Sequence, residues 1–157
     1  ISWTTQSSPT GEDFFDIRYL NEKFIGVGEN GAILTSTDGI TWDNKTSGVT
    51  VKLKEIAFGN ETYVIIGESN VILSSSDTTS WTRRDNRTTS ELLWGIVYGD
   101  KKFVVVGSSR TLSSADGLSW SQVSSKTGNA IAFVDMEKSF TSRKTLPKLP
   151  DLPPLYP

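Results

Sequence analysis

A tryptophan returns every 39 residues along this chain, and no other feature constrains its fold as strongly. The four positions are Trp3, Trp42, Trp81 and Trp120. An aspartate stands four residues before each of the last three, at Asp38, Asp77 and Asp116. Self-similarity at a fixed period of this length is typical of architectures that repeat one supersecondary unit.

Two longer phrases repeat in step with the tryptophan. The first reads ILTSTDGITW at 33–42, ILSSSDTTSW at 72–81 and TLSSADGLSW at 111–120. The second lies upstream and reads IRYLNEKFIGVG at 17–28, IAFGNETYVIIG at 56–67 and IVYGDKKFVVVG at 96–107. A further copy begins as IAFVDMEKSF at 131–140 and then fades. The chain therefore holds three complete units and the beginning of a fourth.

Each unit predicts four short strands joined by turns. Apolar residues stand two apart in the first strand, as with Ile56 and Phe58, which is the period of a half-buried strand. Asn, Asp and Gly follow it and suit a tight turn, because they tolerate positive φ. No segment shows a helical period. The pattern predicts an all-β chain of β-propeller blades, each a four-stranded antiparallel sheet, with three full blades plus a partial one.

The predicted propeller covers residues 1–143 and is incomplete as a ring. Its blades are assigned to about 12–48, 49–87 and 88–125, with a composite blade formed by 126–143 and the strand at 1–6. A closed ring takes four to eight blades. Three explanations stay open: a fragment of a longer propeller, which we favour, association with copies of itself or another chain, and a degenerate four-blade ring. Residues 144–157 hold five prolines and predict an extended linker or strap.

The composition excludes several kinds of chemistry. The 157 residues contain neither Cys nor His, which removes disulfides, thiolate metal sites, the commonest general base and the commonest zinc ligand. A net charge of −2 gives no field that attracts nucleic acid. No apolar run reaches the roughly 18–20 residues that span a bilayer. We expect no catalytic residue, metal or cofactor, no nucleic-acid partner and no membrane insertion.

The phrase Ser-x-Asp-Gly-x-(Thr/Ser)-Trp, present at 36–42 and 114–120, resembles a shortened Asp-box. That turn occurs in sialidase-type and photosystem-assembly-factor-type propellers, and the upstream phrase is similar to propeller repeats of many bacterial surface proteins. The resemblance covers about 13–140 and implies the fold. It implies little about activity, because propellers host unrelated functions. Thr78 stands where the other two copies have glycine, which leaves the geometry of its turn open.

The repeated residues suit architecture better than chemistry. We expect each aspartate to accept hydrogen bonds from backbone amides of its own turn. We expect each tryptophan to fill space between sheets, with its N–H donated to a buried carbonyl. The resemblance implies the same division, since the corresponding turns of sialidase-type propellers lie away from the active site. The predicted structural residues are Trp3, Asp38, Trp42, Asp77, Trp81, Asp116 and Trp120.

Residues that break the repeat are the candidates for binding. The loops 29–31, 68–70 and 108–110 share one end of the sheets with the connections between blades, because alternate turns of a meander lie at opposite ends. That end approaches the propeller axis, where such folds usually bind ligands. An arginine cluster at 83–87 could bind a carboxylate or phosphate, although a solvated loop is the commoner role. The candidate binding residues are Glu29, Asn30, Glu68, Asn70, Arg83, Arg84, Arg87, Trp94 and Arg110.

Three functional hypotheses follow. The one we favour is a non-catalytic binding or scaffold module, recognising a protein or a glycan, within a larger surface, secreted or phage-type structural protein. The second is a fragment of a sialidase-type glycosidase that uses Glu29 or Glu68, because carboxylates are the chemistry left at neutral pH. The third is a purely structural assembly subunit, whose partners are copies of itself or the remaining blades of a longer chain. We predict an extracellular or cell-surface location, on a bacterium or a phage particle.

Overall fold

The computed structural model describes residues 4–5, 7–85 and 91–125, which form three antiparallel sheets of four strands and one short 3₁₀ turn, η1 (Glu29–Gly31). Sheet 1 comprises β1 (Phe14–Leu20), β2 (Lys23–Gly28), β3 (Ile33–Ser36) and β4 (Asp43–Lys45). Sheet 2 comprises β5 (Leu53–Gly59), β6 (Thr62–Gly67), β7 (Ile72–Ser75) and β8 (Thr82–Arg83). Sheet 3 comprises β9 (Leu93–Gly99), β10 (Lys102–Gly107), β11 (Thr111–Ser114) and β12 (Ser121–Ser124). The predicted all-β fold of four-stranded antiparallel sheets is confirmed.

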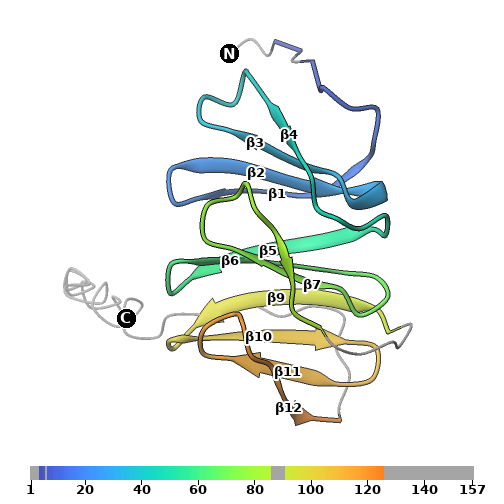
Figure 1. Ribbon diagram of the computed structural model, residues 1–157, viewed down its shortest axis with the longest axis vertical. Helices are drawn as coiled ribbons and strands as arrows, with labels where there is room; N and C mark the ends of the chain where they lie inside the picture. The colour runs from blue at the N-terminus through green and yellow to red at the C-terminus, as the bar shows by residue number, and fades with distance from the viewer. Residues whose placement is uncertain (1–3, 6, 86–90, 126–157) are drawn as a thin grey trace, which may run out of the picture.

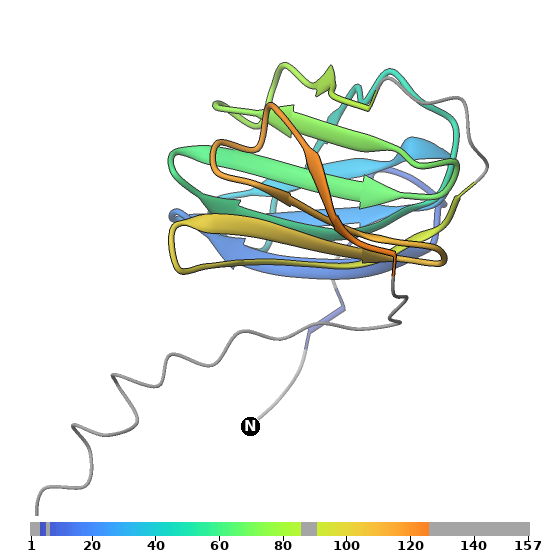
Figure 2. The ribbon, with the colours of Figure 1, turned by 90° about the horizontal axis from the view of Figure 1, so that it is seen from below.

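Each sheet is a meander, hydrogen-bonded in chain order. The first strands of neighbouring sheets contact one another, β1 with β5 and β5 with β9, so these strands form the inner side of the assembly. Figure 1 shows the sheets following one another in chain order along the long axis, and Figure 2 shows them face to face. Consecutive blades of a propeller have this arrangement.

The hairpin between the first two strands has one backbone conformation in all three sheets. Both of its turn residues have positive φ, between 45° and 64°. Such a turn matches the right-handed twist of the strands that it joins. Asn or Asp at the first position accepts a left-handed backbone at low cost, which explains the residues chosen there. The pairs are Asn21-Glu22, Asn60-Glu61 and Asp100-Lys101.

The aspartate turn between the third and fourth strands is built in the same way in each sheet. Asp38 Oδ1 accepts hydrogen bonds from the backbone N–H groups of Ile40 and Thr41, both at 2.8 Å, and from Ser36 Oγ at 3.0 Å. Asp77 and Asp116 make the same three contacts. The backbone hydrogen bonds favour the ionised carboxylates and lower the pKa of all three, that of Asp38 to about 2.

Thr78 keeps the turn of the second copy although it replaces a glycine. Its φ is 66°, close to the 72° of Gly39 and the 77° of Gly117. Its hydroxyl donates to the Asp77 carbonyl at 2.5 Å and lies 3.5 Å from Lys23 Nζ of sheet 1. A β-branched residue in a left-handed backbone conformation costs conformational energy. At Thr78 the same residue also contacts Lys23 of the neighbouring sheet.

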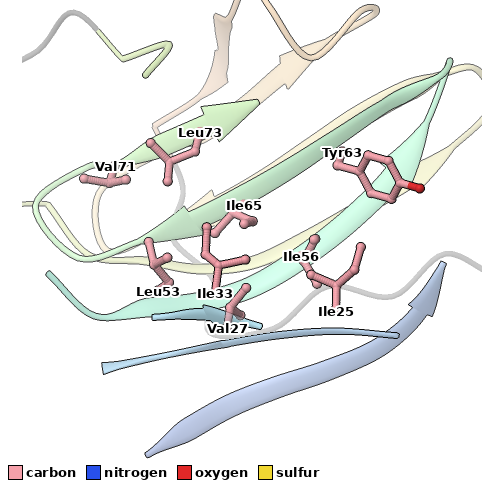
Figure 3. Close-up of a cluster of buried hydrophobic side chains, with 9 residues drawn as sticks. All are labelled: Ile25, Val27, Ile33, Leu53, Ile56, Tyr63, Ile65, Val71 and Leu73. Carbon is pink, nitrogen blue, oxygen red and sulfur yellow. The ribbon is translucent and has the colours of Figure 1, made fainter. Parts of the chain in front are cut away.

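The hydrophobic core lies between the sheets. Side chains of β6 alternate between two interfaces, with Tyr63 and Ile65 facing sheet 1 and Val64 and Ile66 facing sheet 3, which explains the continuous apolar run of that strand. Figure 3 shows the first cluster, formed by Ile25, Val27, Ile33, Leu53, Ile56, Tyr63, Ile65, Val71 and Leu73. The second cluster is formed by Ala57, Val64, Ile66, Ile72, Leu93, Ile96, Phe103, Val105 and Leu112.

A carboxylate joins each inner strand to the next. Asp16 Oδ2 accepts a hydrogen bond from the backbone N–H of Ile56 at 3.2 Å, and Glu55 Oε2 accepts one from Ile96 at 2.8 Å. The two acids occupy the same position of the repeat, immediately before its first isoleucine. Sheet 3 has Gly95 at this position, so the series of carboxylate links ends there.

The tryptophans do not all have the predicted hydrogen bond. Trp81 Nε1 donates to the Thr78 carbonyl at 3.2 Å, and the ring packs against the first core cluster. Trp120 packs against Phe103, with ring centroids 6.3 Å apart, but its buried Nε1–H has no partner within the described chain. The predicted hydrogen bond to a carbonyl is therefore wrong for Trp120.

Several predictions concern residues that the structure does not describe. Trp3, Arg87, the segment 126–143 of the composite blade and the Pro-rich segment 144–157 lie outside the described residues. Of the strand predicted at 1–6 only residues 4 and 5 are described, and neither is in a strand. The blade boundaries also stay predictions. In the described part of the chain, no helix has the length and apolar character needed to cross a membrane.

Candidate functional site

A β-bulge interrupts each inner strand at the same position of the repeat. The pairing with the second strand skips Phe15 in β1, Lys54 in β5 and Trp94 in β9. A bulge redirects the side chain of its extra residue, and such features are common beside functional sites. Lys54 Nζ lies 4.5 Å from the ring centroid of Phe15 and 5.8 Å from that of Trp94, which is within the range of cation–π attraction. We call these three residues the bulge cluster.

Two acid–lysine pairs surround the bulge cluster. Lys52 Nζ lies 2.7 Å from Glu29 Oε1, and Lys54 Nζ lies 3.6 Å from Glu68 Oε1. The hydrogen bond and charge of Glu29 raise the pKa of Lys52. The two lysines were not among the sequence candidates, although a lysine at the repeat position of two aromatics marks Lys54 as unusual.

A second feature is a groove of about 360 Å³ between sheets 2 and 3, which we call the polar groove. Ile72 of β7 and Leu112 of β11 contribute its apolar floor. Its polar lining comes from the loops before β7 and β11, the start of the connection after β8 and the turn before β12. The residues that carry its chemistry are Asn70, Arg84, Asp85, Arg110, Ser119 and Trp120.

A buried ion pair borders the polar groove. Arg110 is 6% exposed and Glu91 is 8% exposed. Arg110 Nη2 contacts Glu91 Oε2 and donates to Asn70 Oδ1 at 2.8 Å. Glu91 Oε1 accepts hydrogen bonds from the backbone N–H and the hydroxyl of Ser109, at 3.1 and 2.7 Å. The Nε–H of Arg110 is buried and has no hydrogen-bond partner among the described residues.

The corresponding pair between sheets 1 and 2 is apolar. Glu91 corresponds to Val51, because the carbonyl oxygen of each accepts a hydrogen bond from the loop of the preceding sheet. Arg110 corresponds to Val71, because the carbonyl oxygen of each accepts one from the glycine that ends the second strand. Val51 and Val71 both belong to the first core cluster. Charged side chains therefore replace an apolar contact at one of two otherwise similar interfaces.

Among the described residues, no acid pairs with the positive charge of Arg84. Its Nε donates to Ser74 Oγ at 2.6 Å, which orients the guanidinium. The neighbouring Asp85 is engaged by Arg83, through hydrogen bonds of 2.7 and 3.1 Å, and Glu91 is engaged by the other groove arginine. Among the residues described, no carboxylate lies within 4.0 Å of the Arg84 nitrogens.

Sheet 1 offers a direct comparison for Arg84. Lys45 stands three residues after its tryptophan, as Arg84 does, and it pairs with Asp43 at 3.4 Å. Thr82 occupies the place of Asp43 in sheet 2. The second repeat therefore lacks the acid that stands two residues before the cation in sheet 1 and has a half-buried arginine as that cation.

The predicted binding residues do not form one site. Asn70, Arg84 and Arg110 line the polar groove, whereas Glu29, Glu68 and Trp94 lie around the bulge cluster. Asn30 donates to Glu12 at 2.8 Å, and Arg83 is held by Asp85. Asn70 and Arg110 are both largely buried, and their role in binding stays a prediction. No group of three or more acids in the described chain could hold a metal ion.

Comparison with known proteins bears on the fold. No family model and no curated protein matches the chain. The solved structure of YCF48 from Cyanidioschyzon merolae matches 81% of this chain and 42% of that one, with a TM-score of 0.65 and 23% identity. A structure of YCF48 bound to D1 peptide matches 78% of this chain and 42% of that one, with a TM-score of 0.56 and 18% identity. The fold is that of β-propeller blades.

The likeness has two consequences. The chain spans less than half the length of these solved propellers. The predicted extracellular or cell-surface location, on a bacterium or a phage particle, is wrong by this comparison, because the structures that the chain resembles are of YCF48, which is not a surface protein of either. The location was predicted from the resemblance of the upstream phrase to repeats of bacterial surface proteins, and that resemblance was a poor guide to location.

Proposed function

We propose that this chain is a non-catalytic protein-binding module that holds a carboxylate-bearing segment of its partner in the polar groove. Arg84 is the observation that carries the proposal. Its guanidinium is oriented by Ser74, half-buried in the groove and free of any acid partner in the described chain. A carboxylate of the partner would supply the opposite charge that the described residues do not.

The chemistry of the groove fits such a ligand. The planar guanidinium of Arg84 can bind a carboxylate through two parallel hydrogen bonds, which are stronger than neutral ones. Leu118, which is exposed, and the half-buried ring of Trp120 provide apolar surface beside it. An extended peptide with an acidic residue and an apolar neighbour matches this combination.

The repeat itself separates architecture from function. Features needed for every blade, such as the aspartate turns, occur in all three sheets. The charged lining occurs at one interface, where Glu91 and Arg110 replace Val51 and Val71. Burying charges in place of a hydrophobic contact seldom adds stability. Packing therefore does not explain why charged residues replace the two valines, whereas binding of a ligand does.

The comparisons add support of a limited kind. One of the similar structures is YCF48 bound to D1 peptide, so a propeller of this fold holds a peptide. The glycosidase hypothesis gains no comparable support, since Glu29 and Glu68 are each paired with a lysine and neither lines the polar groove. We therefore place protein recognition ahead of glycan recognition.

An array of synthetic 12-residue peptides tests the proposal. The peptides are made as matched sets that carry Asp or Glu, or Asn or Gln in their place. We expect the acidic member of a bound set to bind about tenfold or more tightly, because a charge-assisted hydrogen bond contributes about 1.5–3 kcal/mol. Arg84→Gln is expected to remove this preference.

Lys45→Gln is the matched control, since it removes the corresponding cation of sheet 1, which already has an acid partner. It should leave peptide binding unchanged. The proposal is wrong if no peptide is retained, if neutral peptides bind as well as acidic ones, or if Arg84→Gln and Lys45→Gln behave alike. Circular dichroism spectra of the variants check that the sheets are intact.

A further inference from the structure

A groove of about 230 Å³ lies between sheet 1 and the aspartate turn of sheet 2, and most of the residues that line it are Ser or Thr. Lys23 of β2 and Thr35 of β3 stand two residues from Ile25 and Ile33, which belong to the first core cluster (Figure 3). Because residues two apart on a strand share a face, Lys23 and Thr35 face sheet 2. We call this feature the hydroxyl groove, and its chemistry comes from Lys23, Thr35, Thr37, Thr78 and Thr79.

Lys23 brings a positive charge to the groove without an acid partner in the described chain. Its half-buried side chain places Nζ 3.5 Å from the Thr78 hydroxyl, and no described carboxylate lies within 4.0 Å of this nitrogen. Lys102, the counterpart of Lys23 in sheet 3, pairs with Asp100 at 3.2 Å. Sheet 1 has Asn21 in the place of Asp100. The charge of Lys23 is therefore available to a ligand.

The hydroxyl of Thr35 has no hydrogen-bond partner in the described chain, although the residue is only 7% exposed. Its counterpart in sheet 2, Ser74, accepts a hydrogen bond from Arg84 Nε at 2.6 Å. Sheet 1 has Lys45 in the place of that arginine, and Lys45 pairs with Asp43 at 3.4 Å. Leaving a largely buried hydroxyl unpaired costs free energy. An acceptor atom of a ligand would pair with it.

Thr78 adds a strained residue to the same groove. Its φ of 66° is uncommon for a β-branched residue, and the other two copies of the turn have glycine there. Its hydroxyl contacts Lys23 Nζ and donates to the Asp77 carbonyl. Backbone strain of this kind is often retained at functional sites. Glycine would relieve the strain but would remove the contact that positions the lysine.

We infer that the hydroxyl groove binds a phosphoryl group, either as inorganic phosphate or as a phosphate ester on a partner. The ammonium group of Lys23 supplies the opposite charge, as lysine does in other phosphate sites. The hydroxyls of Thr35, Thr37 and Thr79 supply hydrogen-bond donors from both sheets, and none of the three has a partner in the described chain. The inference does not depend on the peptide site of the polar groove.

The lining favours a phosphoryl group over two other ligands. Lysine offers a point charge rather than the planar fork with which arginine pairs with a carboxylate. Hydroxyls from both sheets suit a tetrahedral group, whose oxygens point in several directions. A sugar would stack on an aromatic ring, and no aromatic residue lines this groove in the described chain. The negative charge of Asp43, which also lines the groove, is offset by Lys45.

An NMR titration of the isotope-labelled chain at constant ionic strength tests the inference. The probes are inorganic phosphate, N-acetyl-O-phosphothreonine amide, its unphosphorylated form and acetate. We expect the amide signals of Thr35, Thr37 and Thr79 to shift with both phosphate probes, with a dissociation constant of about 1 mM or lower. Tighter binding of the ester would identify a phosphorylated side chain as the source of the group, and tighter binding of inorganic phosphate would identify the free ion.

Four variants separate binding from structure. Lys23→Gln should weaken phosphate binding by about tenfold, whereas the matched control Lys102→Gln should leave it unchanged. Thr35→Val and Thr78→Gly should each weaken binding by about threefold or more. Neither should lower the melting temperature, because the first removes an unpaired hydroxyl and the second relieves a strained backbone. A purely structural role of these residues would lower the melting temperature and leave phosphate binding unaffected.

Three outcomes would overturn the inference. The first is that neither phosphate probe shifts the three threonine amides, and the second is that acetate binds as tightly as phosphate. The third is that Lys23→Gln and Lys102→Gln behave alike. Phosphate that shifts the amide of Ser119 alone would be bound in the polar groove, which would overturn this inference and leave the proposed function standing. Arg84→Gln should not change the response of Thr79.

Discussion

The Glu91–Arg110 pair should be removable as a pair but not one residue at a time. Their side chains are 5% and 7% exposed, so each charge depends on the other. Arg110→Val leaves Glu91 with two hydrogen bonds from Ser109, and we expect a loss of about 3 kcal/mol, at the lower end for a broken buried pair. Glu91→Val leaves a buried guanidinium with Asn70 as its one acceptor among the described residues, and we expect a loss of about 4–5 kcal/mol.

The double variant recreates an arrangement that the protein already contains. Val51 and Val71 pack at the corresponding place between sheets 1 and 2. We therefore expect the double change to alter stability by no more than about 1 kcal/mol, or to raise it, as replacing a buried ion pair by apolar residues often does. The expected coupling between the two positions is large because each single change leaves an unpaired buried charge.

Urea denaturation followed by tryptophan fluorescence measures all four proteins of this cycle. Free energies are compared at equal m-values, which also checks that unfolding is a single transition. Single changes that each cost less than about 1 kcal/mol would refute the reasoning, since the charges would then be hydrated. A double variant as unstable as the sum of the singles would refute it equally, because the sheet 1–2 interface would be no guide to this one.

Three further predictions follow from the fold. Phe103→Ala, at a fully buried position of the second core cluster, should lower the free energy of unfolding by about 3–5 kcal/mol in the same urea assay. Gly59→Ala should lower it by about 1–3 kcal/mol, because a Cβ there would lie 2.1 Å from Tyr98 Cγ, and Tyr98→Ala in the same chain should recover part of the loss. Stability should decline as the pH falls from about 4 to 2, since the pKa of Asp38 is lowered from 3.8 to about 2 and its turn binds the ionised form. Thermal melts across this range should show a weaker decline for Asp38→Asn, and equal slopes would contradict the assignment.

The sequence predicts the parts of the fold that one repeat unit determines by itself. The hairpin turn needs only Asn60 and Glu61 with positive φ, and the aspartate turn needs only Asp77 and the two amides that follow it. These contacts span a few residues, so their pattern is visible in a string of letters. Counting such units was enough to predict three four-stranded sheets.

The polar groove could not be predicted in the same way. Arg110 aligns with Val71 at the 39-residue period, but Glu91 aligns with Val51 only after an insertion in the third copy. Their pairing depends on side chains from a loop and a connection that meet in space. Lys54 is an intermediate case. The sequence shows a lysine at the repeat position that holds Phe15 and Trp94 in the other copies, but it does not show the bulge that redirects all three side chains.

The contact between Gly59 and Tyr98 limits how such a protein can be rearranged by evolution. The ring of Tyr98 lies against a backbone without a side chain, whereas its counterpart Phe58 shares its cluster with Leu20, which stands in the place of that glycine. Exchanging the first two repeats within the gene would set the ring of Tyr98 against a leucine. Recombination that preserves folding must therefore keep together the residues that contact one another across an interface. The segment that can be exchanged then runs from the middle of one sheet to the middle of the next.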